Sequence, residues 1–256
     1  MRIVGIAAVA FSIALAASGP AVAERLVSTF SSPNIQITSS FDGATQSLFG
    51  NIESETPGVA PQGPFNVIVV VTGPPQDRVA RLKTDVFGIW TNTDQVTFRQ
   101  FPSFYSVLAS GKLQSIADPQ VLLEESVFPT DQALAAVAGK ASPKGTEFGA
   151  ELVRLMTEAG HFVIDEGAVH FLSNTAYVAQ VALPSDVPNG EFVAHTIVLD
   201  QNRQMVAEGS QSFSVTKSGF ENFVFVASRQ QPLLYGLVCV LLALGTGWLA
   251  GVVFRR

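Results

Sequence analysis

The sequence predicts a mainly β protein: one or more immunoglobulin-like antiparallel sandwiches with a helical connector, followed by one C-terminal transmembrane helix. Three observations lead to this prediction. Short apolar or alternating segments, bounded by Gly, Pro, Asn and Asp, recur about every ten residues. Residues 118–162 interrupt them with helical patterns, and residues 232–254 contain no charge.

The N-terminus has the pattern of a secretory signal peptide over residues 1–23. A basic Met1-Arg2 start precedes an apolar run over 3–17, and Ala21 and Ala23 form a small-x-small cleavage signal before Glu24. We therefore expect an exported chain that begins at Glu24. The alternative is an uncleaved N-terminal anchor.

Residues 24–117 are the first predicted β region. Its clearest strand is the continuous apolar run 65–71, stopped by Gly73-Pro74-Pro75. The other strands expected in this region cover 26–27, 35–38, 46–52, 78–83, 86–91, 96–101 and 104–108.

Residues 118–162 are the predicted helical connector. Asp118-Pro119 has the pattern of an N-cap followed by proline at the first helical position. Further helices are expected over 130–138 and 146–159, the latter amphipathic and closed by Gly160. Residues 163–229 form a second β region, with strands over 169–172, 177–183, 192–199 and 204–216, and this region either completes the first sandwich or follows it.

Residues 232–254 are predicted to cross a membrane once. As a helix, they would extend roughly 35 Å at about 1.5 Å per residue, enough for a hydrocarbon core of about 30 Å. Arg255-Arg256 follow at once, and basic flanks stay in the cytoplasm. We expect an inner (cytoplasmic) membrane protein with most of its chain in the periplasm and a cytoplasmic tail, residues 255–256.

Charge and cysteine content limit the function. The region between signal peptide and tail has 12 basic and 21 acidic residues, a net charge of −9, so a nucleic-acid partner is not expected. The only cysteine, Cys239, lies in the predicted span, which excludes an intramolecular disulfide. No Gly-x-Ser-x-Gly pattern or phosphate-binding glycine loop is present, so we expect no enzymatic activity and no cofactor.

One region combines basic and aromatic residues in an otherwise acidic chain. We single out Arg81, Lys83, Trp90, Arg99 and Tyr105 as a candidate surface for a small anion or an acidic partner. The alternative is a sandwich core with solvated arginines on its outer face.

The histidines are candidate metal ligands. Glu166 and His170 would share a strand face if 166–170 were a strand, but their spacing matches no metal-ligand pattern and we expect ordinary surface residues. His195 alternates with Val193 and Ile197, which predicts a hydrogen-bonded, half-buried histidine. No metal site is predicted.

Small residues recur every fourth position in the predicted span: Cys239, Ala243, Gly247 and Gly251. Such a stripe lets a second helix approach closely. The alternative is a plain membrane anchor.

Several short motifs together resemble one family. The motifs lie at 35–43, 48–50, 88–90, 102–105, 183–184, 188–190, 234–236 and 247–248. In this order they resemble the Alph_Pro_TM family of transmembrane proteins of alphaproteobacteria. The resemblance implies a second basic residue after Lys83, but Thr84-Asp85 follow it here, and this difference weakens the case for an anion site there.

The resemblance implies a membrane-transport neighbourhood, since members of the family are often encoded beside a sulfite-exporter-like permease. It supplies no catalytic residues. We therefore expect a non-enzymatic, single-pass accessory subunit of a membrane (transport) complex, whose partner is an integral permease or a second copy of the chain. The alternative is an exported sensor or carrier domain that binds a small anion or a metal.

Overall fold

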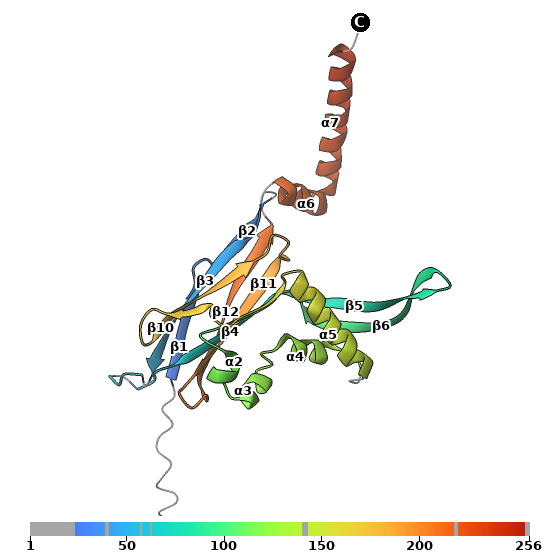
Figure 1. Ribbon diagram of the computed structural model, residues 1–256. Helices are drawn as coiled ribbons and strands as arrows, with labels where there is room; N and C mark the ends of the chain where they lie inside the picture. The colour runs from blue at the N-terminus through green and yellow to red at the C-terminus, as the bar shows by residue number, and fades with distance from the viewer. Residues whose placement is uncertain are drawn as a thin grey trace, which may run out of the picture.

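The computed structural model describes residues 24–38, 41–56, 58–61, 63–139, 143–217 and 220–253. The predicted signal peptide, residues 1–23, and the predicted tail, residues 255–256, lie outside this part. Within it the protein is mainly β, with several helices and one long apolar C-terminal helix (Figure 1). The predicted fold class is confirmed at this level.

The strands form two packed sheets and a separate hairpin. The small sheet has the order β1-β3-β10-β9, the large sheet has the order β2-β12-β11-β4-β7-β8, and β5 pairs with β6 alone. The small sheet comprises β1 (Glu24–Phe30), β3 (Ala44–Ser54), β9 (Val169–Phe171) and β10 (Ala176–Leu183). The large sheet comprises β2 (Asn34–Ile37), β4 (Asn66–Thr72), β7 (Tyr105–Ala109), β8 (Phe162–Asp165), β11 (Gly190–Leu199) and β12 (Met205–Lys217).

Strands from before and after the helical segment share both sheets. β10 pairs with β3 in the small sheet, and β11 pairs with β4 in the large sheet. The two β regions proposed from the sequence are therefore one sandwich. A first apolar core fills the space between the sheets and contains Leu48, Val69, Tyr177, Phe192 and Phe213.

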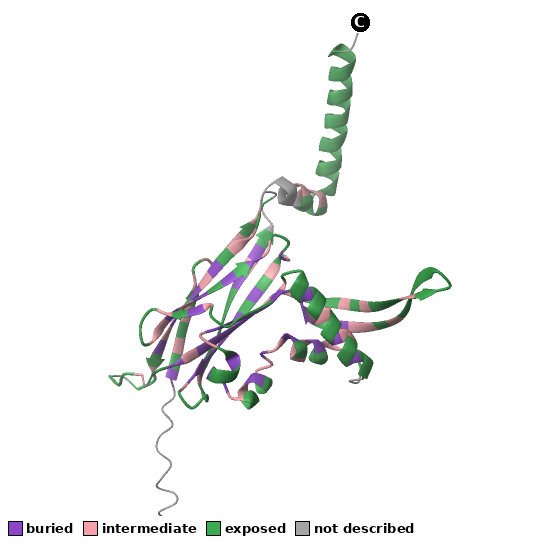
Figure 2. Ribbon diagram, viewed as in Figure 1, coloured by how far each residue is buried: buried purple, intermediate pink, exposed green. Residues whose placement is uncertain are grey.

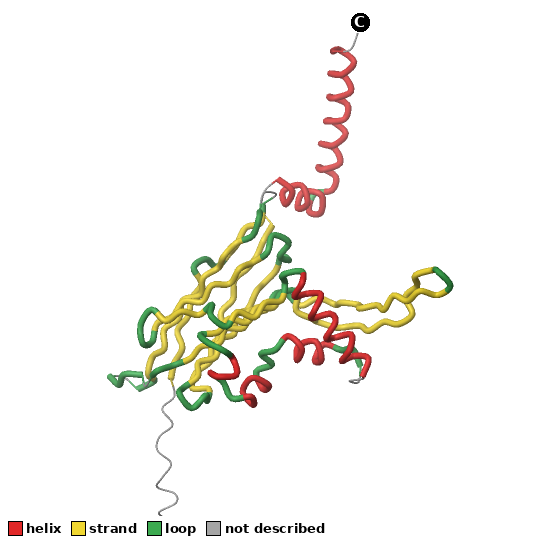
Figure 3. Tube along the Cα trace, in the orientation of Figure 1, coloured by secondary structure: helices red, strands yellow, loops and turns green. Residues whose placement is uncertain are grey.

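A second apolar core lies on the other face of the large sheet, where four helices cover it (Figures 1 and 3). It contains Ile68, Tyr105 and Ile197 from the sheet and Leu122 and Met156 from the helices. The helices are α2 (Leu113–Ile116), α3 (Pro119–Glu124), α4 (Pro129–Ala136) and α5 (Pro143–Glu158). The segment predicted as a connector is thus a third layer of the fold.

The predicted start of α3 is confirmed in detail. Asp118 is the N-cap and its Oδ1 accepts a hydrogen bond from the Gln120 amide at 2.9 Å, with Pro119 in the first turn. The helical layer nevertheless begins earlier than predicted, at Leu113 in α2. The amide of Leu113 donates to Glu166 Oε1 at 3.1 Å, a cap supplied from 53 residues away. Such a partner is invisible to local sequence patterns.

Residues 75–102 differ from the prediction. Three short strands were expected over 78–101, but two long antiparallel strands are present, β5 (Pro75–Val86) and β6 (Ile89–Pro102). They form a hairpin that extends sideways from the sandwich (Figure 1). Polar residues that lie between the three predicted strands, such as Thr84 and Asn92, are within the ladder, because a ribbon solvated on both sides does not require apolar residues there.

Two helices follow the sandwich. β12 ends at Lys217, and residues 220–230 form α6 (Phe220–Gln230), so the end of the predicted β region 163–229 is helical. α7 (Pro232–Val253) coincides with the predicted span, residues 232–254, over its described residues.

A close contact between β3 and β10 leads to a testable prediction. Gly50 lies directly opposite Tyr177, and a Cβ at Gly50 would come within 2.2 Å of the buried Tyr177 ring. Gly50→Ala should therefore lower the free energy of unfolding by about 1–3 kcal/mol through overpacking. Thermal unfolding of the full-length protein in mild detergent measures this loss. Gly167→Ala, where the nearest atom lies 3.9 Å away, is the matched control, and equal midpoints for the two variants would contradict the packing.

Candidate functional site

The outer part of the β5–β6 hairpin, residues 81–95, is a solvent-exposed arm. Only Thr84 and Asp94 are partly covered in this range, whereas Phe98 and Phe101 at the base of β6 are fully buried in the second core. Figure 2 shows this change from buried base to exposed end. Lys144 from α5 also holds the arm, through an ion pair with Asp94 at 2.6 Å. The helical layer therefore fixes the base and leaves the end free.

The end of the arm is apolar. Phe87 is fully exposed, and the side chains of Ile89 and Trp90 are 66% and 69% exposed. Val86 completes this apolar tip, which we define as residues 86–90. Isolated exposed apolar residues are ordinary on protein surfaces, but a cluster of large ones at the end of a projecting ribbon indicates a contact surface.

The turn in the apolar tip has an unusual residue. Phe87 and Gly88 both have positive φ, 54° and 81°, and they are the only two residues between the strands. This is the pattern of a type I′ turn, in which Asn-Gly is favoured and a bulky first residue is strained. The Gly88 amide donates to Asp85 Oδ1 at 2.7 Å, which stabilises the turn. Phe87 contributes strain and no burial, so its side chain has no visible role in the fold.

The predicted anion or partner surface is divided by the fold. Arg81 and Lys83 are exposed on the arm and Trp90 lies in the apolar tip, while Arg99 lies at the arm's base beside residues 135–139. Trp90 and Arg99 are nine positions apart along an extended strand, a distance of about 30 Å. The hairpin has four basic and three acidic residues, so its net charge is only +1.

Tyr105, the fifth predicted surface residue, is buried in the second core. Its hydroxyl donates to the carbonyl oxygens of Ser126 at 2.8 Å and Val127 at 3.3 Å. Burial raises the pKa of this phenol well above its ordinary value, so it stays a hydrogen-bond donor. Tyr105 therefore positions the segment after α3 and cannot line an exposed surface.

The histidines are placed differently from one another. Glu166 lies in a turn and caps α2, so it does not pair with His170 of β9. His195 is hydrogen-bonded and 32% exposed, as predicted, with Nδ1 3.1 Å from Ser210 Oγ. The sequence interpretation missed its carboxylate neighbours, Glu125 and Glu208. Glu125 lies 70 residues earlier in the chain, so only the packing of α3 on β11 brings it there.

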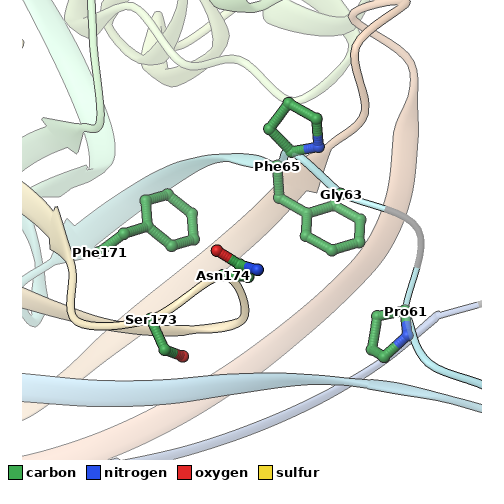
Figure 4. Close-up of a pocket in the computed structure, with 7 residues that line it drawn as sticks. Pro61, Gly63, Phe65, Phe171, Ser173 and Asn174 are labelled. Carbon is green, nitrogen blue, oxygen red and sulfur yellow. The ribbon is translucent and has the colours of Figure 1, made fainter.

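A hollow of about 540 Å³ lies between the loop before β4 and the loop after β9 (Figure 4). Phe65 and Phe171 supply its apolar walls, and Ser173 and Asn174 supply polar groups. None of the lining residues is titratable. The hollow therefore offers no acid, base or charged ligand group.

Among the described residues, α7 is the one helix long and apolar enough to cross a membrane, with a mean hydropathy of 2.2. None of its residues is buried by the rest of the protein. The predicted stripe of Cys239, Ala243, Gly247 and Gly251 lies within α7, and a Cβ at either glycine would meet no atom within 4 Å. The surface of α7 is thus available to lipid or to another helix.

The family model described as "Putative transmembrane protein (Alph_Pro_TM)" matches residues 25–256. No curated protein matches the chain. The matched range includes the sandwich, the arm and α7, so it spans every element described above. The family and the apolar helix together support a membrane location.

The stripe on α7 leads to a test. Gly247→Leu with Gly251→Leu adds apolar bulk that lipid accepts but that separates two closely packed helices. We expect this double variant to insert normally into the membrane. In a membrane two-hybrid assay it should lose association with its partner helix, from a second copy of the chain or from an integral permease. Leu241→Ala with Leu244→Ala, outside the stripe, is the control. Unchanged association of the glycine variant would show that the stripe makes no helix contact.

Proposed function

This chain belongs to the Alph_Pro_TM family of transmembrane proteins, and on that premise we propose that it is a non-enzymatic, single-pass accessory subunit of a membrane complex. In this proposal α7 anchors the chain and the sandwich is a rigid support for the β5–β6 arm. The arm contacts the partner through its apolar tip. The observation that carries the proposal is the full exposure of Phe87 in a strained turn.

The strain is the first argument for a contact. A bulky residue at positive φ costs on the order of 1–3 kcal/mol and persists only where something compensates for it. Phe87 touches no core, so burial of its own side chain within the described protein does not compensate for the strain. Residues that break a local rule without a folding benefit are typical of functional sites. A partner that buries the Phe87 ring would offset the strain, because burying a phenylalanine side chain contributes about 1.5–3 kcal/mol of free energy.

The arm's stability is the second argument. A two-stranded ribbon is marginal in water unless further strands or a helix support it. Helices α4 and α5 support this ribbon at its base and, through the ion pair of Lys144, at Asp94. A partner that packs on the outer arm would stabilise it.

The direction of the arm favours a partner beside the chain in the same membrane. In Figure 1 the arm extends from the sandwich transverse to α7. With α7 along the membrane normal, the apolar tip therefore reaches sideways, over a neighbouring membrane protein. An integral transport protein fits this position, and the family's implied neighbourhood points to the same class.

We also infer the type of sandwich and its orientation. Strands β1-β3-β10-β9 and β12-β11-β4 follow the ABED and GFC orders of an immunoglobulin sandwich, which supports that assignment. The basic Arg255-Arg256 pair supports a cytoplasmic C-terminus with the sandwich in the periplasm.

The orientation can be tested with a reporter that is active only outside the cytoplasm. Fused after Ser228, the reporter should be active, because the signal peptide exports everything before α7. Fused after Arg256, it should be silent. The reverse pattern would place the sandwich in the cytoplasm.

The apolar tip can be tested by separating stability from association. Phe87→Asn places a residue that tolerates positive φ in the turn, so it should stabilise the protein by about 1 kcal/mol. The same change should weaken association with the partner, because the ring is lost. Thermal unfolding and co-purification in mild detergent measure the two effects. Leu172→Asn removes a large apolar side chain outside the arm that is 65% exposed, and it should change neither.

The partner's class can be tested by photo-crosslinking in native membranes. A photoreactive residue at position 87 should give an adduct with an integral transport protein, while the same residue at position 172 should not. An adduct between two copies of this chain would show that the partner is a second copy and not a transport protein. A soluble protein, or no adduct at position 87, would overturn the docking role of the arm.

A further inference from the structure

A histidine and two glutamates converge where the helical layer meets the open part of the large sheet. His195 lies on β11, Glu208 lies on β12 and Glu125 follows α3. The Nε2 of His195 is 3.2 Å from Glu125 Oε2 and 3.6 Å from Glu208 Oε2. One ligand atom from each residue lies within 4.8 Å of the other two.

We propose that Glu125, His195 and Glu208 form a binding site for a first-row divalent cation of the Zn²⁺ class. This site is independent of the docking role of the arm. A cation bound there would join the end of α3 to β11 and β12, and so lock the helical layer onto the sheet.

The spacing of the ligand atoms fits such a cation. Two ligands about 2.1 Å from a tetrahedral zinc ion lie about 3.4 Å apart. The two separations from His195 Nε2, 3.2 and 3.6 Å, bracket this value. Imidazole and carboxylate groups are both ordinary zinc ligands, and three protein ligands leave a fourth position for water. Glu208 is 57% exposed, so water has access to that position.

The second nitrogen of His195 supports the same assignment. Its Nδ1 lies 3.1 Å from Ser210 Oγ, directly across the β11–β12 ladder. When Nδ1 carries the proton and donates it to Ser210, the lone pair of Nε2 faces the two carboxylates. Metal-binding histidines are oriented by such a contact at their other nitrogen.

Charge gives a reason for a cation at this point. Two carboxylates and a neutral imidazole nitrogen are three acceptors facing one another, an arrangement that repels unless a positive charge lies among them. A proton on Nε2 would neutralise one carboxylate, whereas a divalent cation would neutralise both. A measurement of metal binding therefore distinguishes a proton on Nε2 from a bound divalent cation.

Glu125 is held in place before any cation binds. Its amide donates to the Val121 carbonyl at 3.0 Å, and the next carbonyl, of Ser126, accepts from the Tyr105 hydroxyl and from Gln132 Nε2. Glu125 itself is 23% exposed. Because His195 and Glu208 are on neighbouring strands of one sheet, that sheet and the end of α3 together present all three ligands.

The test is Zn²⁺ titration of the full-length, chelator-treated protein in mild detergent, purified with a tag that contains no histidine. We expect one Zn²⁺ per chain by calorimetry and a rise in the thermal midpoint. Ser210→Ala should weaken binding about tenfold, since it removes only the orienting contact. His195→Asn and Glu208→Ala should weaken it more than Ser210→Ala and abolish the thermal shift.

The controls are His170→Asn and Glu191→Gln, which change exposed residues of the same types elsewhere on the sandwich. Both should bind Zn²⁺ like the unaltered protein. Glu208 is exposed, so Glu208→Ala is expected to fold even where His195→Asn does not. The proposal is overturned if Zn²⁺ does not bind, if Glu208→Ala binds it unchanged, or if Ca²⁺ binds equally well, because calcium selects oxygen ligands and would not need His195.

Discussion

The burial of β4 on both faces is the constraint on which the rest of the structure depends. Val67, Val69 and Val71 point into the core between the sheets, while Ile68 and Val70 point into the core under the helices. Fully burying each such side chain contributes about 1.5–3 kcal/mol. A two-layer sandwich would leave the second set in water, so the fold requires a third layer. Helices α2 to α5 provide it.

The same requirement positions both candidate sites. The second core contains Phe98 and Phe101, which fix the base of the arm. The ion pair between Asp94 of the arm and Lys144 adds a second link to the same helical layer. The second core also receives Tyr105, whose hydroxyl holds the segment that carries Glu125. The arm is thus a projection from the helix-covered side of the sheet, and the His195 cluster lies at the border of that side.

Exposure has different meanings along this chain. The apolar side chains of α7 are exposed on all sides of the helix, and this uniform distribution is that of a helix in a membrane. The apolar tip is instead a small group at the end of a polar ribbon, built on a turn that disfavours Phe87. Lipid accounts for the first, and for the second we propose contact with a specific partner.

The sequence by itself determined the elements whose patterns are local: the α7 span, the Asp118 cap, the buried strand at 65–71 and the alternating strands after residue 169. It also predicted the hydrogen-bonded state of His195. Only the tertiary structure decided that the helical segment is a layer, that residues 75–102 form one hairpin, that Tyr105 is buried, and that Glu125 and Glu208 join His195. These outcomes depend on contacts between residues far apart in the chain, and local periodicity carries no information about which distant surface a helix or a strand will cover.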